Sequence, residues 1–272
     1  MNKVKFGKGE KPTSRSEQWK QIFKEHYAEI ISASLYTFVF WIPLFAWVLF
    51  AFNFEIFQEN SILNVLVLYS GIALTLIIAG LGLAGGFYVF RKFLWNEGCN
   101  VHLDFFKGIK QNGKQFAQIY LFIGIMYLLL HVVSQAIMVT EWSDISIIAF
   151  LAIEYVVFIC LLIVAFFMQT QTIFYENSFK QSFKNGIRFL VGTVLKSLGL
   201  FVVLFLPFIL YEFVPNGTVK LIAILISAII YFGILELTFM CHSLELFDKY
   251  INKKQHPDYY LKGLDKVEKV DF

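Results

Sequence analysis

The sequence has 272 residues, of which 58% are hydrophobic and only 16% are charged. Soluble domains are about half apolar and about a quarter charged, so this composition excludes an ordinary soluble domain and indicates contact with lipid. The formal net charge of +3 is uninformative by itself. The basic segments adjoin long apolar runs, which favours contact with lipid over contact with nucleic acid.

The first 29 residues are polar and lack the early apolar core of a cleavable signal peptide. We expect residues 1–29 to form a cytoplasmic tail. Between Ser16 and Ile30, apolar residues recur at helical spacing opposite charged ones. This pattern predicts either an amphipathic helix in the membrane interface or a short lead-in to the first span.

Six apolar segments follow, each long enough to cross a hydrocarbon core, which takes about 20 residues. We expect the spans at residues 30–54, 61–90, 116–138, 145–168, 189–211 and 219–241. The predicted fold is therefore all-α, a polytopic membrane helix bundle, with a six-helix transmembrane domain at 30–241 and a cytoplasmic tail at 242–272.

The orientation follows from the basic residues. Of the 23 Lys and Arg residues, all but Lys196 and Lys220 lie in the two tails, in residues 91–115 or in residues 178–188. Because positive charge collects on the cytoplasmic side of membrane proteins, we expect both termini in the cytoplasm.

Two segments between spans share a pattern. Phe106-Lys107 is followed by Asn112, and Phe179-Lys180 is followed by Asn185 with the same spacing. Each segment precedes an outward-running span, which predicts a parallel internal repeat with two cytoplasmic amphipathic elbows.

Each elbow is expected to sink its Phe stripe into the inner leaflet, expose Lys to anionic lipid and place its Asn at the foot of the next helix. The predicted partner or lipid surface consists of Phe105, Phe106, Lys107, Asn112, Phe179, Lys180 and Asn185.

A family resemblance rests on three stretches. These are the small-residue run from Gly80 to Tyr88, the run from Asp104 to Phe116, and the segment from Phe174 to Asn185. Together, over about residues 75–200, they resemble the YesL-like family of bacterial multi-pass membrane proteins. The resemblance implies a bacterial cytoplasmic membrane protein and an accessory role in carbohydrate uptake.

The glycines of the first run are expected to let neighbouring helices pack closely, as small residues do in membranes. They are Gly80, Gly82, Gly85 and Gly86.

Ionisable side chains inside membrane spans are candidates for function because burying them is costly. His131, Gln135 and Glu154 fall at similar depth in two neighbouring spans and predict a ligand or proton site. Lys196 and Glu236 predict an intramembrane ion pair. In both cases the alternative is that the groups satisfy each other and fix the register of the helices.

No nucleophile–base arrangement and no metal-ligand spacing stands out, so we expect neither an enzyme nor a cofactor or metal. The expected function is a non-enzymatic accessory or scaffold protein associated with a carbohydrate or other solute uptake system. Its expected partners are anionic inner-leaflet lipids and another membrane protein or a second copy of the chain. The alternative is a small transporter or channel that uses His131, Gln135 and Glu154.

Overall fold

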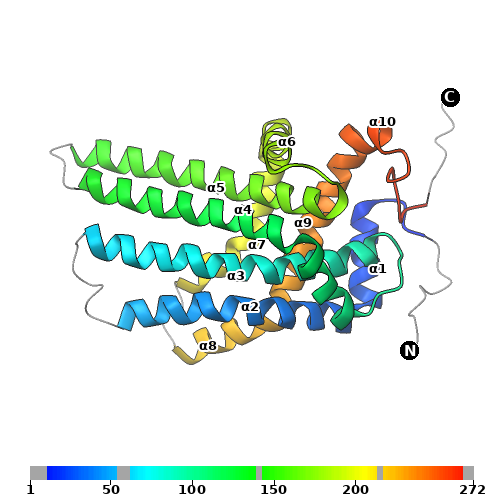
Figure 1. Ribbon diagram of the computed structural model, residues 1–272, viewed down its shortest axis with the longest axis horizontal. Coiled ribbons are helices and arrows are strands. Elements are labelled where there is room, and N and C mark those ends of the chain that lie inside the picture. Colours follow the sequence, from blue (N-terminus) through cyan, green and yellow to red (C-terminus); the bar gives the residue numbers. More distant parts are fainter. Residues whose placement is uncertain (1–10, 54–61, 139–142, 213–216, 266–272) are drawn as a thin grey trace. The chain divides into compact units, whose positions relative to one another are not determined.

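A computed structural model describes residues 11–53, 62–138, 143–212 and 217–265. Most of these residues are helical and none lies in a strand, which confirms the predicted all-α fold. The elements, drawn in Figure 1, are α1 (Arg15–Glu25), α2 (Tyr27–Asn53), α3 (Ile62–Leu94), α4 (Val101–Met138), α5 (Asp144–Phe174), α6 (Phe179–Gly192), α7 (Val194–Glu212), α8 (Gly217–Ile226), the π-helical turn η2 (Ser227–Tyr231), α9 (Phe232–Phe247), the π-helical turn η3 (Asp248–Asn252) and α10 (Lys253–Gln255).

The helices have the length and apolarity of a multi-pass membrane protein. Five stretches of the described chain are long and apolar enough to cross a membrane, and α6 with α7 makes a sixth if this bent pair is one span. The five are Tyr27–Ala51, Ile62–Leu94, Val101–Ile137, Asp144–Phe174 and Ala228–Gln255.

The two predicted elbows have different conformations. The first elbow is not a separate element but the first turns of α4, which starts at Val101 and runs without a break to Met138. Asn100 sets this start, because its side-chain oxygen accepts from the backbone N–H of Leu103 at 3.1 Å while its own N–H donates to Asp104 at 2.9 Å.

The second elbow is the separate helix α6. It ends at Thr193, which leaves the helical conformation at φ −143° and ψ 29°. Beyond this residue the chain turns by 96° into α7.

Contacts between Cα atoms divide the chain into two compact units. Unit 1 comprises Met1–Thr37, Leu83–Gln111 and Leu206–Phe272, and unit 2 comprises Phe38–Gly82 and Asn112–Phe205. The core of each unit is rich in fully buried aromatic rings, such as Phe87 and Phe239 in unit 1 and Phe116 and Phe167 in unit 2.

In unit 2, two pairs of consecutive long helices, α2 with α3 and α4 with α5, run antiparallel and are joined by hydrogen bonds. The indole N–H of Trp47 on α2 donates to the carbonyl of Leu68 on α3 at 3.0 Å. The side-chain amide of Gln169 on α5 donates to the Tyr120 hydroxyl on α4 at 3.3 Å. Figure 1 shows α4 and α5 running side by side.

In unit 1, α1 packs against α9 rather than lying with its apolar side toward lipid. Its buried residues are Arg15, Gln18 and Ile22, and the indole N–H of Trp19 donates to the Thr238 hydroxyl at 3.0 Å. The predicted interfacial helix is therefore a packed part of unit 1.

Candidate functional site

The helix α6 is held in place by a polar hub at the end of α5. Gln171 is 0% exposed, and its side-chain N–H donates to the carbonyl oxygens of Phe167 at 3.2 Å and Ser182 at 3.1 Å. Its side-chain oxygen accepts from the amides of Asn177 at 3.4 Å and Asn185 at 3.2 Å. Every hydrogen-bonding position of this side chain is thus used to fix the turn between α5 and α6.

One side of α6 is built to pack closely on α5. A Cβ on Gly186 would lie 2.9 Å from a methyl carbon of Val164, so only glycine fits there without a shift. Three residues further on, the ring of Phe189 contacts that of Phe167 at 5.6 Å between centroids.

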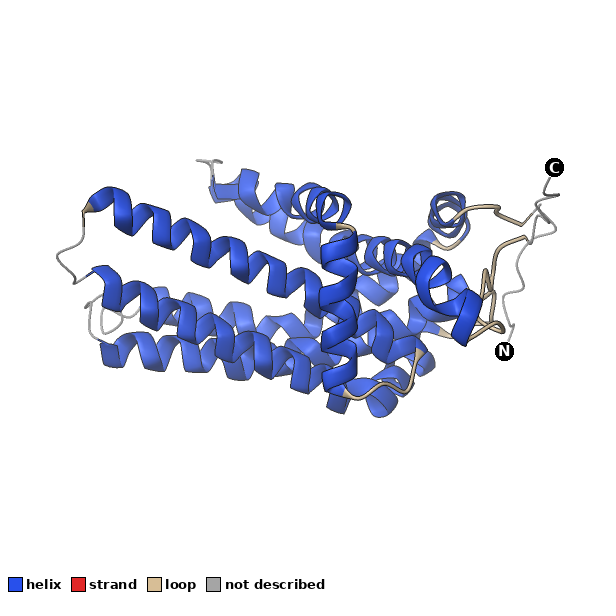
Figure 2. Ribbon diagram, turned by 90° about the horizontal axis from the view of Figure 1, so that it is seen from above, coloured by secondary structure: helices blue, strands red, loops and turns tan. Residues whose placement is uncertain are grey.

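The other side of α6 is exposed and combines two stripes. Lys180, Lys184 and Arg188 recur every four residues, so they form one cationic line along the helix, and α6 contains no acidic residue. Ile187, 40% exposed, borders this line on its apolar side, and Val191, 74% exposed, lies among the cations near the end of the helix. Figure 2 shows α6 from the side, lying across the long helices of unit 2.

A helix that lies across apolar spans, with exposed apolar and cationic stripes side by side, has the geometry of an interfacial membrane helix. We call the exposed side chains of Phe179, Lys180, Lys184, Ile187, Arg188 and Val191 the α6 face.

The residues predicted for the partner or lipid surface divide between core and surface. Phe106 is 48% exposed and Lys107 is exposed, but Phe105 is 0% exposed and lies 5.3 Å from the ring of Tyr36. The prediction that Phe105 faces lipid is wrong. It lies on the side of α4 that packs into unit 1, because Gly85 leaves room for its ring.

The two repeated asparagines do not share the predicted role. Asn185 bonds Gln171 of the preceding helix rather than the foot of the following one. Asn112 lies inside the continuous helix α4, where it is partly exposed.

The glycine run of α3 packs within the chain. A Cβ on Gly80 would lie 2.6 Å from the ring of Tyr120, and one on Gly85 would lie 2.8 Å from the ring of Phe105. Gly82 is buried as well.

The contacts of His131 differ from the expected pairing of this side chain with Glu154. The His131 ring stacks on that of Tyr69 at 3.9 Å and meets that of Tyr127 edge-on at 4.5 Å between centroids. Glu154 accepts a hydrogen bond at 2.9 Å from Ser134, which lies one turn from His131 on α4. Among the described residues no ion pair joins His131 to Glu154, and a ligand or proton site with Gln135 stays a prediction.

Glu236 on α9 is the most deeply buried acidic side chain in the described chain, with 0% exposed. One carboxylate oxygen accepts from the Thr37 hydroxyl on α2 at 3.0 Å. The other has no hydrogen-bond partner in the part of the chain that the structure describes, and it lies against the Cα of Gly86 on α3. Lys196 belongs to the other unit, and its pairing with Glu236 stays a prediction.

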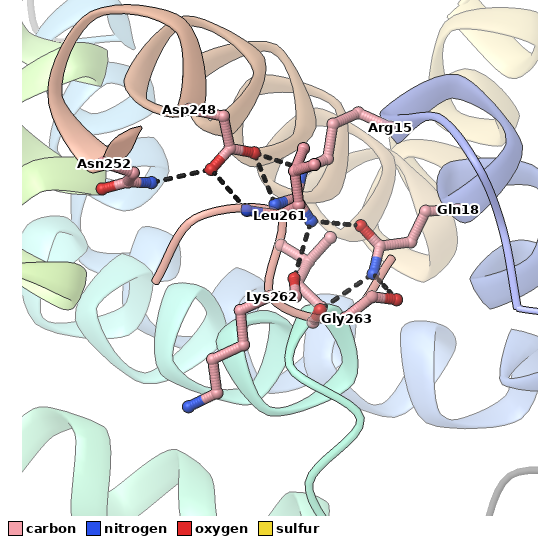
Figure 3. Close-up of polar contacts among 8 residues, drawn as sticks. Arg15, Gln18, Asp248, Asn252, Leu261, Lys262 and Gly263 are labelled. Atoms are coloured by element: carbon pink, nitrogen blue, oxygen red, sulfur yellow. Dashed lines mark hydrogen bonds and ion pairs between the residues drawn. The ribbon is translucent and has the colours of Figure 1, made fainter. Parts of the chain in front are cut away.

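A second buried polar cluster ties the two ends of the chain together within unit 1 (Figure 3). The guanidinium of Arg15 on α1 bonds the carboxylate of Asp248 at the end of α9, with the shortest contact at 2.7 Å. It also donates to Gln18 at 2.7 Å and to the carbonyl of Lys262 at 3.1 Å.

The cluster holds the C-terminal segment in a defined turn. The second oxygen of Asp248 accepts from Asn252 at 2.8 Å and from the backbone N–H of Leu261 at 3.1 Å (Figure 3). Gly263 has φ +88°, and a Cβ there would overlap the carbonyl of Leu94, so the turn requires glycine.

Sequence reasoning missed this cluster, since Arg15 and Asp248 are 233 positions apart. The one local signal was the helix start at Ser14, whose hydroxyl accepts from the backbone N–H of Glu17 at 3.2 Å. That signal predicts where α1 begins, but it does not identify Asp248 as the partner of Arg15.

Comparison with known protein families, curated proteins and solved structures finds no match for this chain. The resemblance to the YesL-like family therefore stays a prediction.

Proposed function

We propose that the chain is a non-enzymatic accessory protein of a bacterial cytoplasmic membrane, with both termini in the cytoplasm. It binds another membrane protein, such as a component of a carbohydrate or other solute uptake system. The observation that carries this proposal is the α6 face, an exposed amphipathic surface on a rigidly held helix.

Rigidity supports a binding role, because a surface that is ordered before binding loses little conformational entropy when a partner docks. The Gln171 hub and the close contact of Gly186 with Val164 order α6 in this way. The apolar stripe suits a partner within the bilayer, and the cationic stripe suits the anionic headgroups of the inner leaflet.

The glycine run of α3 supports this choice of surface indirectly. Small residues on a membrane helix are candidates for contact with a partner helix. Here Gly80 and Gly85 are occupied by side chains of the chain itself. Phe106 and Lys107 of the first elbow also stay exposed, but the α6 face is the larger exposed surface and combines apolar with cationic side chains.

The test is affinity purification of the tagged full chain from its native host in mild detergent, followed by mass spectrometry. Wild type should co-purify with a membrane protein in defined ratio. Replacement of Lys180, Lys184 and Arg188 by glutamine should reduce that recovery at least tenfold, which corresponds to about 1.4 kcal/mol.

A matched control removes the same charge elsewhere. Lys249, Lys253 and Lys254 are exposed, and their replacement by glutamine should leave recovery of the partner unchanged. Equal loss in both triple variants would show a dependence on total charge and would refute the α6 face as the binding surface. Recovery of wild type without any enriched partner would refute the accessory role.

A further inference from the structure

The accessory role does not explain why Glu236 is buried inside the helix bundle. Its carboxyl group is fully buried between three helices, yet the described residues supply one hydrogen bond where a carboxylate can accept several. Buried polar groups are paired in the great majority of cases, so an unpaired one calls for a physical explanation.

Neither form of the carboxyl group is fully satisfied in this setting. As a carboxylate, the group carries a buried charge that only Thr37 stabilises. As a carboxylic acid, it can donate its O–H to the Thr37 hydroxyl through one oxygen, but the second oxygen still has no partner among the described residues. Gain or loss of one proton therefore changes which hydrogen bonds the surrounding helices must provide to the carboxyl group.

The helices around this group are tightly packed. The unpaired oxygen lies against Gly86, where an added methyl group would overlap the carboxyl. Gly233, one turn earlier on α9, is similarly close to Ile30 of α2, because a Cβ there would lie 2.7 Å from that side chain. Because this packing leaves little free space, a change in the hydrogen bonding of the carboxyl group should shift the side chains and helices in contact with it.

Among the described residues, no charged side chain forms an ion pair with Glu236. In the described part of the chain, the hydrogen bonds and ion pairs of Glu236 are limited to Thr37. The titratable and charged side chains on the elements packed around it are Arg15, Glu17, Lys20, Lys24 and Glu25 on α1, Tyr27, Glu29 and Tyr36 on α2, Tyr69, Tyr88, Arg91 and Lys92 on α3, and Cys241, His242 and Glu245 on α9, with His26 between α1 and α2.

We propose that Glu236 is a proton-exchange site inside the helix bundle, and that its proton sets how closely α2 and α3 pack against α9. The proton is exchanged with solvent water, and no bond other than the carboxyl O–H forms or breaks. The proposal is independent of the accessory role, since no residue of the α6 face takes part.

The direct test is infrared difference spectroscopy of the full chain in detergent during a pH titration. Wild type should show the C=O band of a buried carboxyl group whose amplitude changes with pH. Glu236→Gln should lack this band, because the amide keeps the shape and the bond to Thr37 but cannot exchange the proton. Glu154→Gln, which alters a carboxyl group bonded to Ser134, should retain it.

The coupling to packing is read at Trp19, which bonds Thr238 two residues beyond Glu236. The fluorescence of Trp19, taken as the difference between wild type and Trp19→Phe, should change with the same midpoint as the infrared band. In Glu236→Gln this change should be lost.

Two further variants keep the test decisive if Glu236→Gln fails to fold. Thr37→Val removes the donor, and Gly86→Ala displaces the carboxyl, so each should shift the titration midpoint. Gly199→Ala, at a position with nothing within 4 Å of the added Cβ, should not. A wild type without a titrating band, or a Trp19 change that persists in Glu236→Gln, would overturn the proposal.

Discussion

At the scale of single residues, the clearest constraint is the buried pair of Arg15 and Asp248. Their side chains are only 4% and 7% exposed. Removing one partner of such a pair leaves an uncompensated charge and destabilises by about 3–5 kcal/mol, whereas replacing both by apolar residues is often tolerated.

We therefore predict that Asp248→Leu and Arg15→Met each lower the midpoint of thermal unfolding strongly. The double variant Arg15→Met with Asp248→Leu should be less destabilised than the sum of the single changes. The measurement is a double-mutant cycle on the purified chain in detergent. Additive losses would mean that the two residues act independently, contrary to the contacts in Figure 3.

Cys99 lies in the loop between α3 and α4, outside the candidate membrane spans. Burial raises the pKa of its thiol to about 12, with a further contribution from the nearby Asp104 carboxylate. Because the thiolate is the reactive form, we expect this partly buried thiol to react slowly with alkylating reagents in the folded chain.

We predict that Cys99, kept as the sole cysteine after Cys160 and Cys241 are replaced by alanine, reacts with iodoacetamide at least tenfold more slowly in the folded than in the unfolded chain. The folded thiol holds its proton up to a pKa of about 12, while the unfolded thiol loses it near its ordinary value of 9.0. The ionisation of Cys99 should therefore not change the free energy of unfolding below pH 9.0, and should lower it progressively as the pH rises from there toward about 12. Equal reactivity of folded and unfolded protein would contradict the burial of this thiol.

At the scale of elements, the predicted fifth span qualifies only together with α6 as a bent pair, and the last apolar helix runs over Ala228–Gln255 rather than 219–241. The sequence predicts the first four spans at apolar helices of the described chain, because twenty apolar residues have few alternatives to a membrane helix. It fails on the elbows, since the same Phe-Lys…Asn pattern occurs in two conformations. The first copy continues into α4 behind the cap at Asn100, and the second ends at Thr193, where the chain turns by 96°. The pattern describes one amphipathic helix face but not where that helix ends.

The two glycines of α6 provide a matched prediction at this scale. Gly186→Ala should destabilise the chain by about 1–3 kcal/mol, because the methyl group would crowd Val164 at 2.9 Å. Gly192→Ala, with nothing within 4 Å of the new Cβ, should be neutral or stabilise by up to about 1 kcal/mol. Thermal unfolding of both variants tests this order, and a larger loss for Gly192→Ala would contradict the packing of α6 on α5.

At the scale of the whole molecule, the sequence predicts the helical membrane bundle but not its polar interior. Charge placement and hydropathy are local properties, so they can be read along the chain. The Thr37–Glu236 bond and the Gln171 hub depend on contacts between helices, which a single sequence does not reveal. The pairing of Arg15 with Asp248 is missed for the same reason, since each residue reads locally as part of a charged tail.

The proposed function requires that α6 lie along the surface of the membrane, so in the chain without its partner the apolar stripe should face lipid and the cations the headgroups. Spin labels at single cysteines test this most directly, placed at Gln181, Ile187 or Arg188 of the chain reconstituted in anionic vesicles, with Cys99, Cys160 and Cys241 replaced by alanine. The label at Ile187 should be relaxed mainly by lipid-soluble oxygen, and the labels at Gln181 and Arg188, which share another side of the helix, mainly by a water-soluble nickel reagent. Equal exposure of all three labels to the nickel reagent would place α6 away from the membrane and contradict the account.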